Sequence, residues 1–247
     1  MRGRTIAGSD SLAGHGPPRS GKPSRDSVPG MYQPAHKGFA VADPASVLVE
    51  LAARVPATLV TVSADGLRAS ILPMLFDPDD GPLGTLRGHL ARPNPQLRTV
   101  SAGVEALAIF DGPDAYVSPA FYEAKRLTGE VVPTWNYTTV QAHGPLTLRP
   151  EPEWLLAHVR RLVERHEAGR AEPWSIDDTP EGYVETQVRA IIGLEMRISR
   201  LEAKRKLSQN RSAADFEGVI EGLSEGSPRE QAVAADMRRE SPRRPRV

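Results

Sequence analysis

A succession of short strand-forming segments, each separated from the next by a turn rich in Gly or Pro, most constrains what this chain can fold into. The clearest pair is ATLVTV (57–62) and LRASILPMLF (67–76), joined by Ala64-Asp65-Gly66. An Asp-Gly turn between two such runs is the signature of a β-hairpin. Further strands are predicted for TLRGHLA (85–91), VEALAIF (104–110), AYVS (115–118) and WNYTTVQAHGPLTL (135–148). Five or more short strands of this kind favour an antiparallel barrel over a doubly wound parallel sheet.

Helical periodicity flanks and follows this strand region. Helices are predicted over residues 44–54, 152–168, about 180–190 and a last segment that begins near Ser212, and a strand over 191–198 returns to the sheet. In the last helix Phe216, Val219, Ile220 and Leu223 recur at spacings that predict one buried face. The sequence therefore predicts an α+β protein, in which helices lie at the periphery of the barrel.

The two ends of the chain differ in composition from the middle. Residues 1–30 are dense in Gly, Pro and Ser, and residues 227–247 end in the basic, Pro-broken run RRESPRRPRV. We expect both tails to be disordered around a folded body at 31–226. That body holds 20 basic and 26 acidic residues. Because an acidic surface repels the phosphates of DNA, direct DNA binding would depend on a local patch or on the tails.

Several classes of function lack the residues that they require. The sequence has no Cys, which excludes disulfide scaffolds, thiolate nucleophiles and Cys-ligated metal centres. The run GPPRSGKP (16–23) places Pro23 where a phosphate-binding P-loop needs a hydroxyl group, and HExxH does not occur. No apolar run approaches the roughly 18 residues that a membrane span requires. We therefore expect a soluble, cytoplasmic protein.

Three short segments carry more polar and aromatic chemistry than a turn requires. They are GHLARPNPQ (88–96), VPTWNY (132–137) and KRKLSQNR (204–211). Cations bind phosphate, amide side chains bond the edge of a heterocycle, and an indole stacks on its face. Each segment alone is consistent with a capped turn or a solvated face, but together they predict a site for a phosphorylated, planar, heteroaromatic ligand.

These segments, together with MYQP (31–34) and FDGPDAYVSP (110–119), resemble the PaiB-like family of FMN-binding negative transcriptional regulators. The resemblance covers about residues 31–223. It implies a split β-barrel of the kind shared by pyridoxamine-phosphate oxidases and flavin reductases. It also implies a homodimer with FMN at the subunit interface.

The resemblance further implies which residues hold the flavin. Strand residues 69–74 and the segment 89–96 would line the flavin and its phosphate from one subunit, with Arg92 as the phosphate partner. Trp135, Asn136 and residues 206–211 would approach from the other subunit or close the pocket. The expected cofactor-binding residues are Ser70, Leu72, His89, Leu90, Arg92, Asn94, Gln96, Trp135, Asn136, Lys206, Gln209, Asn210 and Arg211. No catalytic residue and no metal ligand is predicted.

Three functions remain open on the sequence. The first is a homodimeric FMN-binding regulator, and the second is an FMN-dependent oxidoreductase such as a flavin reductase or a pyridoxamine-phosphate-oxidase-like enzyme. The third is an interaction protein whose flavin pocket has been lost. This last possibility arises because the family usually has aromatic or histidine residues where this chain has Ser70, Leu97, Phe121, Gln141 and Arg205.

Overall fold

The computed structural model describes residues 30–32, 38–64, 66–100 and 104–241. The chain divides into two units, residues 1–30 and 31–247. Gly30 alone of the first unit is described, so the expected disorder of the N-terminal tail falls on residues outside the description. All the helices and strands named below belong to the second unit.

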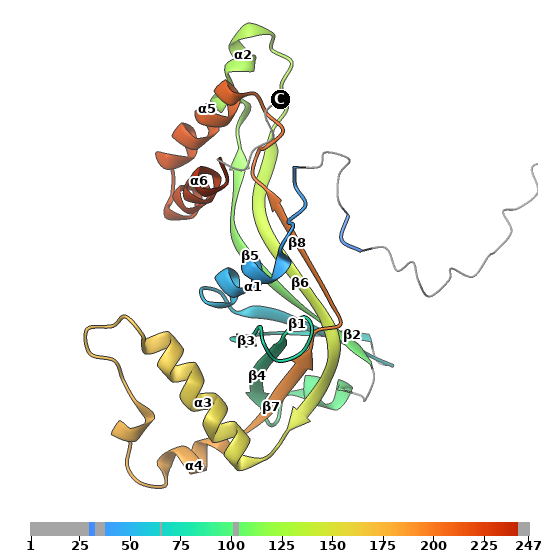
Figure 1. Cartoon of the computed structure of the whole chain (residues 1–247), viewed down its shortest axis with the longest axis vertical. Coiled ribbons are helices and arrows are strands. Elements are labelled where there is room, and N and C mark those ends of the chain that lie inside the picture. Colours follow the sequence, from blue (N-terminus) through green and yellow to red (C-terminus); the bar gives the residue numbers. More distant parts are fainter. Residues whose placement is uncertain (1–29, 33–37, 65, 101–103, 242–247) are drawn as a thin grey trace, which may run out of the picture. The chain divides into compact units, whose positions relative to one another are not determined.

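Eight strands form an antiparallel sheet that makes a split β-barrel (Figure 1). The strands are β1 (Ala57–Ser63), β2 (Gly66–Leu72), β3 (Leu75–Asp77), β4 (Thr85–Ala91), β5 (Glu105–Val117), β6 (Thr134–Arg149), β7 (Ile191–Arg197) and β8 (Arg200–Lys206). Their order is β2-β1-β5-β6-β7-β4-β3, and β8 pairs with β6 off this path. The long strand β6 divides the sheet, because its first half pairs with β8 and its second half with β7.

Six α-helices and three short 3₁₀-helices are described around the sheet. They are α1 (Pro44–Ala52), η1 (Pro95–Thr99), η2 (Pro119–Phe121), α2 (Glu123–Leu127), α3 (Pro152–Glu167), η3 (Ile176–Asp178), α4 (Tyr183–Val188), α5 (Ala213–Ser224) and α6 (Pro228–Glu240). Among the described residues, no helix combines the length and the apolar character needed to cross a bilayer.

The barrel is filled by a main core to which helix α1 contributes. Asp43 caps this helix, because its carboxylate accepts hydrogen bonds from the amides of Ala45 and Ser46. The helix then buries Val47, Leu48 and Leu51 against side chains of the strands. This packing confirms the predicted α+β architecture and leaves the outer face of the sheet available for a site.

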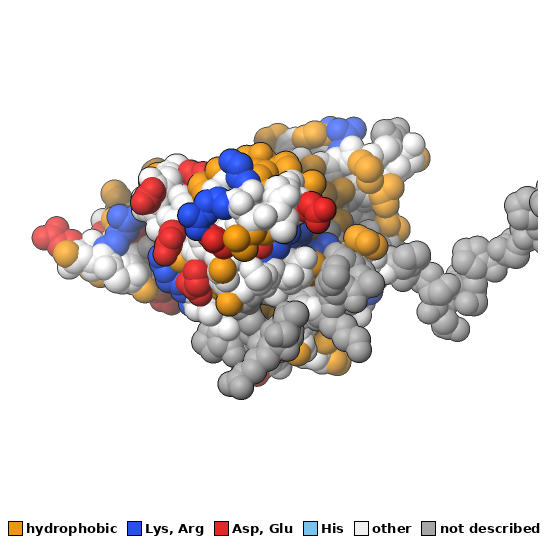
Figure 2. Space-filling model, turned by 90° about the horizontal axis from the view of Figure 1, so that it is seen from above, with side chains coloured by type: hydrophobic (Ala, Val, Ile, Leu, Met, Phe, Trp, Pro, Cys, Tyr) orange, Lys and Arg blue, Asp and Glu red, His pale blue; other side chains and the backbone are white. Residues whose placement is uncertain are grey.

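A second core lies at the far end of the β5–β6 hairpin, next to helices α5 and α6 (Figure 1). The stripe Phe216, Val219, Ile220 and Leu223 that the sequence predicts is buried there. Figure 2 looks onto the same end of the unit. In the coloured part of that face, Lys and Arg side chains are interspersed with Asp and Glu, so this face carries no extended basic patch.

The prediction that the chain is disordered from Ser227 onward is wrong for helix α6. Ser227 forms a capping box with Glu230, and Pro228 occupies the first turn. The helix buries Val233 and Met237 in the second core, and this apolar packing outweighs the basic composition of the segment. Residues 242–247 lie outside the described part of the chain.

Several element boundaries also differ from the sequence prediction. The expected strand over 67–76 is interrupted before β3, where Pro73 has no amide proton to donate. The expected strands 104–110 and 115–118 are one strand, β5, with an irregularity between Asp111 and Asp114. The expected helix over 180–190 is the shorter α4, and β8 occupies a segment for which no strand was predicted.

Candidate functional site

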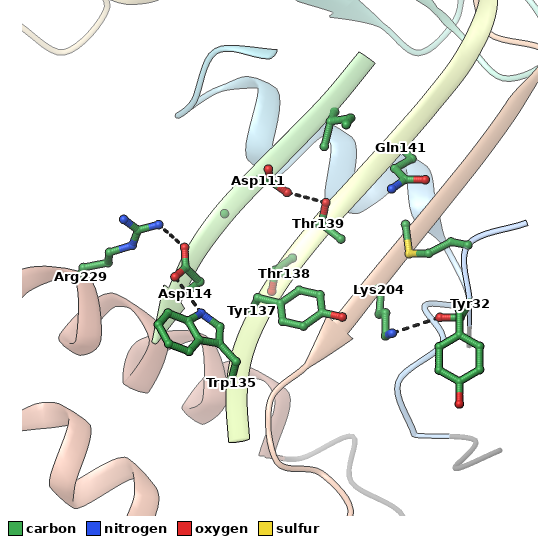
Figure 3. Close-up of a pocket in the computed structure, with 13 residues that line it drawn as sticks. Tyr32, Asp111, Asp114, Trp135, Tyr137, Thr138, Thr139, Gln141, Lys204 and Arg229 are labelled. Carbon is green, nitrogen blue, oxygen red and sulfur yellow. Dashed lines mark hydrogen bonds and ion pairs between the residues drawn. The ribbon is translucent and has the colours of Figure 1, made fainter. Parts of the chain in front are cut away.

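The largest described cavity lies on the outer face of the sheet, where β5, β6 and β8 run side by side (Figure 3). Its volume is about 690 Å³. Because side chains alternate along a strand, Trp135, Tyr137, Thr139 and Gln141 of β6 all face it. The register pairs Thr139 of β6 with Asp111 of β5 on one side and with Lys204 of β8 on the other. The strand geometry therefore gathers aromatic rings, an amide and charges of both signs around one hollow.

Hydrogen bonds fix several of these side chains. The indole Nε1 of Trp135 donates to the Oδ1 atom of Asp114 at 2.8 Å, and the other oxygen of Asp114 pairs with Arg229 from α6. The Trp135 ring also meets the ring of Tyr116 edge-on, with 6.1 Å between their centroids. Helix α6 thus reaches the rim of the cavity and holds the indole in one orientation.

The interior of the cavity is organised by Lys204. Its Nζ atom donates to the carbonyl oxygen of Tyr32 at 3.0 Å. It also lies 5.4 Å and 5.7 Å from the ring centroids of Tyr32 and Tyr137, within the range of cation–π attraction. The hydroxyl of Thr139 donates to Asp111 at 2.6 Å. These contacts fix polar groups beside apolar ring faces, which is the combination that binds a planar heteroaromatic ligand.

The expected residue Asn136 faces the opposite side of β6 from Trp135. It lines a separate small cavity of about 110 Å³, together with Lys206, Asn210 and Arg211. Four expected residues are thus brought together, but away from the indole. Gln209 has a structural role instead, because its side chain bonds the amide of Leu207 and the carbonyl of Arg205.

Three of the residues expected to line the flavin from one subunit lie together where η1 covers the β1–β2 hairpin, namely Ser70, Asn94 and Gln96. Asn94 donates to the hydroxyl of Ser70 at 3.2 Å and caps η1 by accepting from the amide of Gln96. Gln96 is buried and donates to the carbonyl of Leu59 at 2.9 Å, while its Oε1 atom has no hydrogen-bond partner. Neutral donors are therefore concentrated at this point of the sheet.

The other residues expected to line the flavin from that subunit lie elsewhere. Leu72 and Leu90 belong to the main core, so the expectation that their side chains line the flavin is not supported by where they lie. The guanidinium of Arg92 donates to the carbonyls of Arg189 and Ile191 at 2.8 and 3.3 Å. It links the end of β4 to the start of β7.

His89 packs against helix α3 rather than against either cavity. Its Nδ1 atom lies 3.2 Å from Nε2 of His158, and Trp154 stacks on His158 with 5.2 Å between ring centroids. Burial, and to a smaller extent the positive charges of His89, Arg161 and Arg87, lowers the pKa of His158 to about 4. Burial also lowers the pKa of His89. The pair is thus kept neutral in the folded protein.

We expect the free energy of unfolding to fall as the pH drops from about 6.5 to about 4, because His158 takes up a proton more readily when the chain is unfolded. Its pKa is about 4 in the folded state, against 6.5 for an ordinary histidine. The loss contributed by this residue should approach roughly 3 kcal/mol below the folded pKa. Urea denaturation at pH 7, 5.5 and 4.5 measures this loss in the free energy of unfolding. The variant His158→Gln should show a weaker pH dependence, and an equal dependence in both proteins would contradict the assignment.

Four residues of the large cavity are absent from the expected cofactor-binding residues: Asp111, Asp114, Lys204 and Arg229. Lys204 nevertheless lies in the segment 204–211 that the sequence singled out. Tyr137, Thr139 and Gln141 alternate along β6, so they share the face that lines the cavity. Strand partners across that face cannot be identified without the register, and Arg229 enters from a helix that the sequence interpretation treated as a tail.

A family model described as the putative FMN-binding domain matches residues 31–200. The protease synthase and sporulation protein PAI 2 of Bacillus subtilis is 33% identical over 181 residues, which cover 73% of this chain and 84% of that protein. An uncharacterised protein of Aspergillus fumigatus is 36% identical over 198 residues, covering 64% of this chain and 76% of that protein. Among solved structures, the flavocytochrome Anf3 of Azotobacter vinelandii aligns over 74% of this chain and 76% of its own, with a TM-score of 0.50 and 12% identity. That last likeness concerns the fold alone.

Proposed function

The chain belongs to the family of the putative FMN-binding domain, with FMN as its cofactor, and on that premise we propose that it acts as a homodimer and as a regulator of the negative transcriptional type. When bound, FMN supplies a ring that accepts and releases electrons. The chain itself binds and orients that ring and excludes water from it. A ligand of this kind controls a dimer only through different affinities for two of its states.

The observation that carries this proposal is an uncovered apolar surface on the outer face of the sheet. Leu67 of β2 pairs with Val62 of β1. Ile71 of β2 pairs with Thr58 of β1, which in turn pairs with Ile109 of β5. Leu67 is 75% exposed and Ile71 is 73% exposed. The surface continues into the large cavity, because Ile109 belongs to both. A second copy seated on this apolar strip would bury it and close the cavity beside it.

Replacing Ile71 with Asp should dissociate the homodimer, because the change places a charge in the apolar strip that the second copy covers. Sedimentation analysis with and without FMN measures the change, and the dissociation constant should rise at least tenfold. Leu127→Asp is the matched control, since Leu127 is also 73% exposed but lies on α2. Equal behaviour of both variants, or a monomeric wild type, would contradict the proposed interface.

The donor set around β2 and η1 fits the phosphate and ribityl groups of FMN. Register pairs Arg68 with Thr61 and Ser70 with Leu59, so Arg68 and Ser70 share the face of β2 that η1 covers. In the described part of the chain, no carboxylate pairs with the exposed guanidinium of Arg68. Asn94 adds its amide beside Ser70. We propose that these three residues hold the phosphate end, and that Trp135 of the partner copy closes the ring end.

Replacing Arg68 with Ala should weaken FMN binding by about 1.5 to 3 kcal/mol, because a charge-assisted hydrogen bond to phosphate is lost. Arg92→Ala should weaken it less, since the Arg92 guanidinium already bonds two backbone carbonyls. Quenching of flavin fluorescence on titration into the cofactor-free protein gives both affinities. A larger effect at Arg92 would restore it as the phosphate partner and overturn the role of Arg68.

A further inference from the structure

We propose that the small cavity between β6, β8 and the start of α5 binds the phosphate group of a second, phosphorylated ligand, distinct from FMN. Six polar residues line the cavity together with Phe39: Thr134, Asn136, Lys206, Ser208, Asn210 and Arg211. This proposal goes beyond flavin binding, because it assigns to the protein an effector site of its own. Four observations carry it: the charges, the buried amide, the backbone at Ser208 and the volume.

The charged side chains that line the cavity are both positive. Lys206 and Arg211 both line it, and no carboxylate does. The Nζ atom of Lys206 donates to two neutral oxygens, the hydroxyl of Thr134 and the carbonyl of Trp135. Burial, together with the positive charges of Lys204 and Arg211, lowers the pKa of Lys206. An anion between these cations would relieve their mutual repulsion.

The wall of the cavity includes a fully buried amide with a weak partner. Asn136 is 0% exposed, and its Oδ1 atom accepts a hydrogen bond from Ser208. Its Nδ2 atom lies 3.5 Å from the sulfur of Met237, and a thioether is a poor acceptor. An amide nitrogen carries two protons, so Asn136 retains donor capacity for an oxygen atom in the cavity.

The backbone next to the cavity is held in an unusual conformation. Ser208 has φ 62°, and it is the one non-glycine residue with positive φ in the described ranges. Such a conformation costs energy and persists where the surroundings require it. The turn closes with a hydrogen bond from the amide of Arg211 to the carbonyl of Ser208 and leads directly into Ser212, the N-cap of α5. The positive end of this 12-residue helix adds to the attraction for an anion.

The volume decides which group fits. A cavity of about 110 Å³ holds roughly four groups of the size of a water molecule, at about 30 Å³ each. A tetrahedral oxyanion matches this space, whereas an isoalloxazine ring does not. Two cations, the side-chain amides of Asn136 and Asn210 and a nearby helix terminus suit the negative charge of a phosphate group. The cavity that holds the aromatic rings has no lining residue in common with this one, so the two ligands would occupy separate sites.

Binding of a phosphate here would reach the flavin side through Lys206. The ammonium group holds the carbonyl of Trp135, and the side chain of that residue forms the rim of the large cavity. An anion that binds the ammonium group of Lys206 would compete with its hydrogen bond to the carbonyl of Trp135. The same arrangement gives the site a spectroscopic signal, because Trp135 is half exposed and its emission responds to its surroundings.

The test uses the full chain loaded with FMN and titrated with inorganic phosphate against chloride at constant ionic strength. Isothermal titration calorimetry and tryptophan emission give the binding constant for the wild type, Lys206→Gln, Arg211→Gln and the control Lys125→Gln, an exposed lysine of α2. We expect phosphate to bind the wild type and the control equally, and to bind the two cavity variants at least tenfold more weakly. Circular dichroism without phosphate establishes that each variant is folded.

Three results would overturn the inference. If phosphate does not bind the wild type, the site does not exist. If phosphate binds all four proteins with the same affinity, it binds elsewhere on the surface. If the affinity for FMN instead falls tenfold or more in both cavity variants, and phosphate displaces FMN from the wild type, the cavity binds the phosphate group of the flavin. That last result leaves the proposed FMN binding intact, whereas a protein that takes up no FMN at all would contradict the proposed function separately.

Discussion

Replacing Phe216 with alanine should lower the free energy of unfolding by about 4 kcal/mol, since the change removes a buried ring and leaves a cavity. Phe216 is 0% exposed and belongs to the second core, where α5 and α6 pack on the far ends of β5 and β6. Tyr122 packs in the same cluster, so the ring supports the hairpin and both helices. The loss should appear in urea denaturation as a lower midpoint with little change in slope.

The control for this prediction is Phe216→Leu, which keeps most of the apolar volume and should cost clearly less. A loss below about 1 kcal/mol for the alanine variant would mean that the second core is not tightly packed at this position. A separate early transition in the variant would show that the second core unfolds before the barrel. In that case the two cores are energetically independent, although strand β5 contributes residues to both.

Much of the barrel follows from local sequence signals. The predicted strand over 85–91 is β4 as found, and β1 and β2 pair as the predicted antiparallel hairpin. These segments carry β-prone residues between strong turn residues, so local preference and tertiary packing agree. Strand β8 was missed because RLEAKRK contains few such residues; its place is set by pairing along β6.

Helix α6 shows how composition misleads when packing decides. The sequence SPRE carries both a capping box and a first-turn proline, so a start signal was present. Val233, Ala234 and Met237 then provide a narrow apolar stripe within a basic segment. The stripe is stable only against a preformed core, and that core comes from residues more than a hundred positions away, such as Ala115 and Val117.

The site was predicted in chemistry more accurately than in arrangement. Trp135 and Asn136 were placed in one pocket, yet neighbouring strand residues face opposite sides of a sheet. Two cations of KRKLSQNR also line different cavities, Lys204 the large one and Lys206 the small one, although residues two apart share one face of a strand. Residue types identified a phosphorylated ligand, but register decides which side chains meet.

The buried charge cluster that joins α6 to α1 gives the second large expected effect. Replacing Arg205 with alanine should lower the free energy of unfolding by about 4 kcal/mol, because removal of one partner leaves buried charges uncompensated. The guanidinium of Arg205 pairs with Glu50 of α1 and Glu240 of α6, and its side chain is 13% exposed. The side chain of Glu240 is 12% exposed, so water cannot fully replace the lost partner.

Arg54→Ala provides the matched control for Arg205→Ala. Arg54 also pairs with Glu50, but its side chain is 54% exposed, and a solvated ion pair contributes at most about 1 kcal/mol. Urea denaturation of both variants should therefore show a loss several times larger for Arg205. Equal losses would mean that the cluster is effectively solvated, and that α6 is held by its apolar contacts alone. A large difference would instead make Arg205 the residue that fastens the C-terminal helix, and with it Arg229 and the rim of the large cavity, to the barrel.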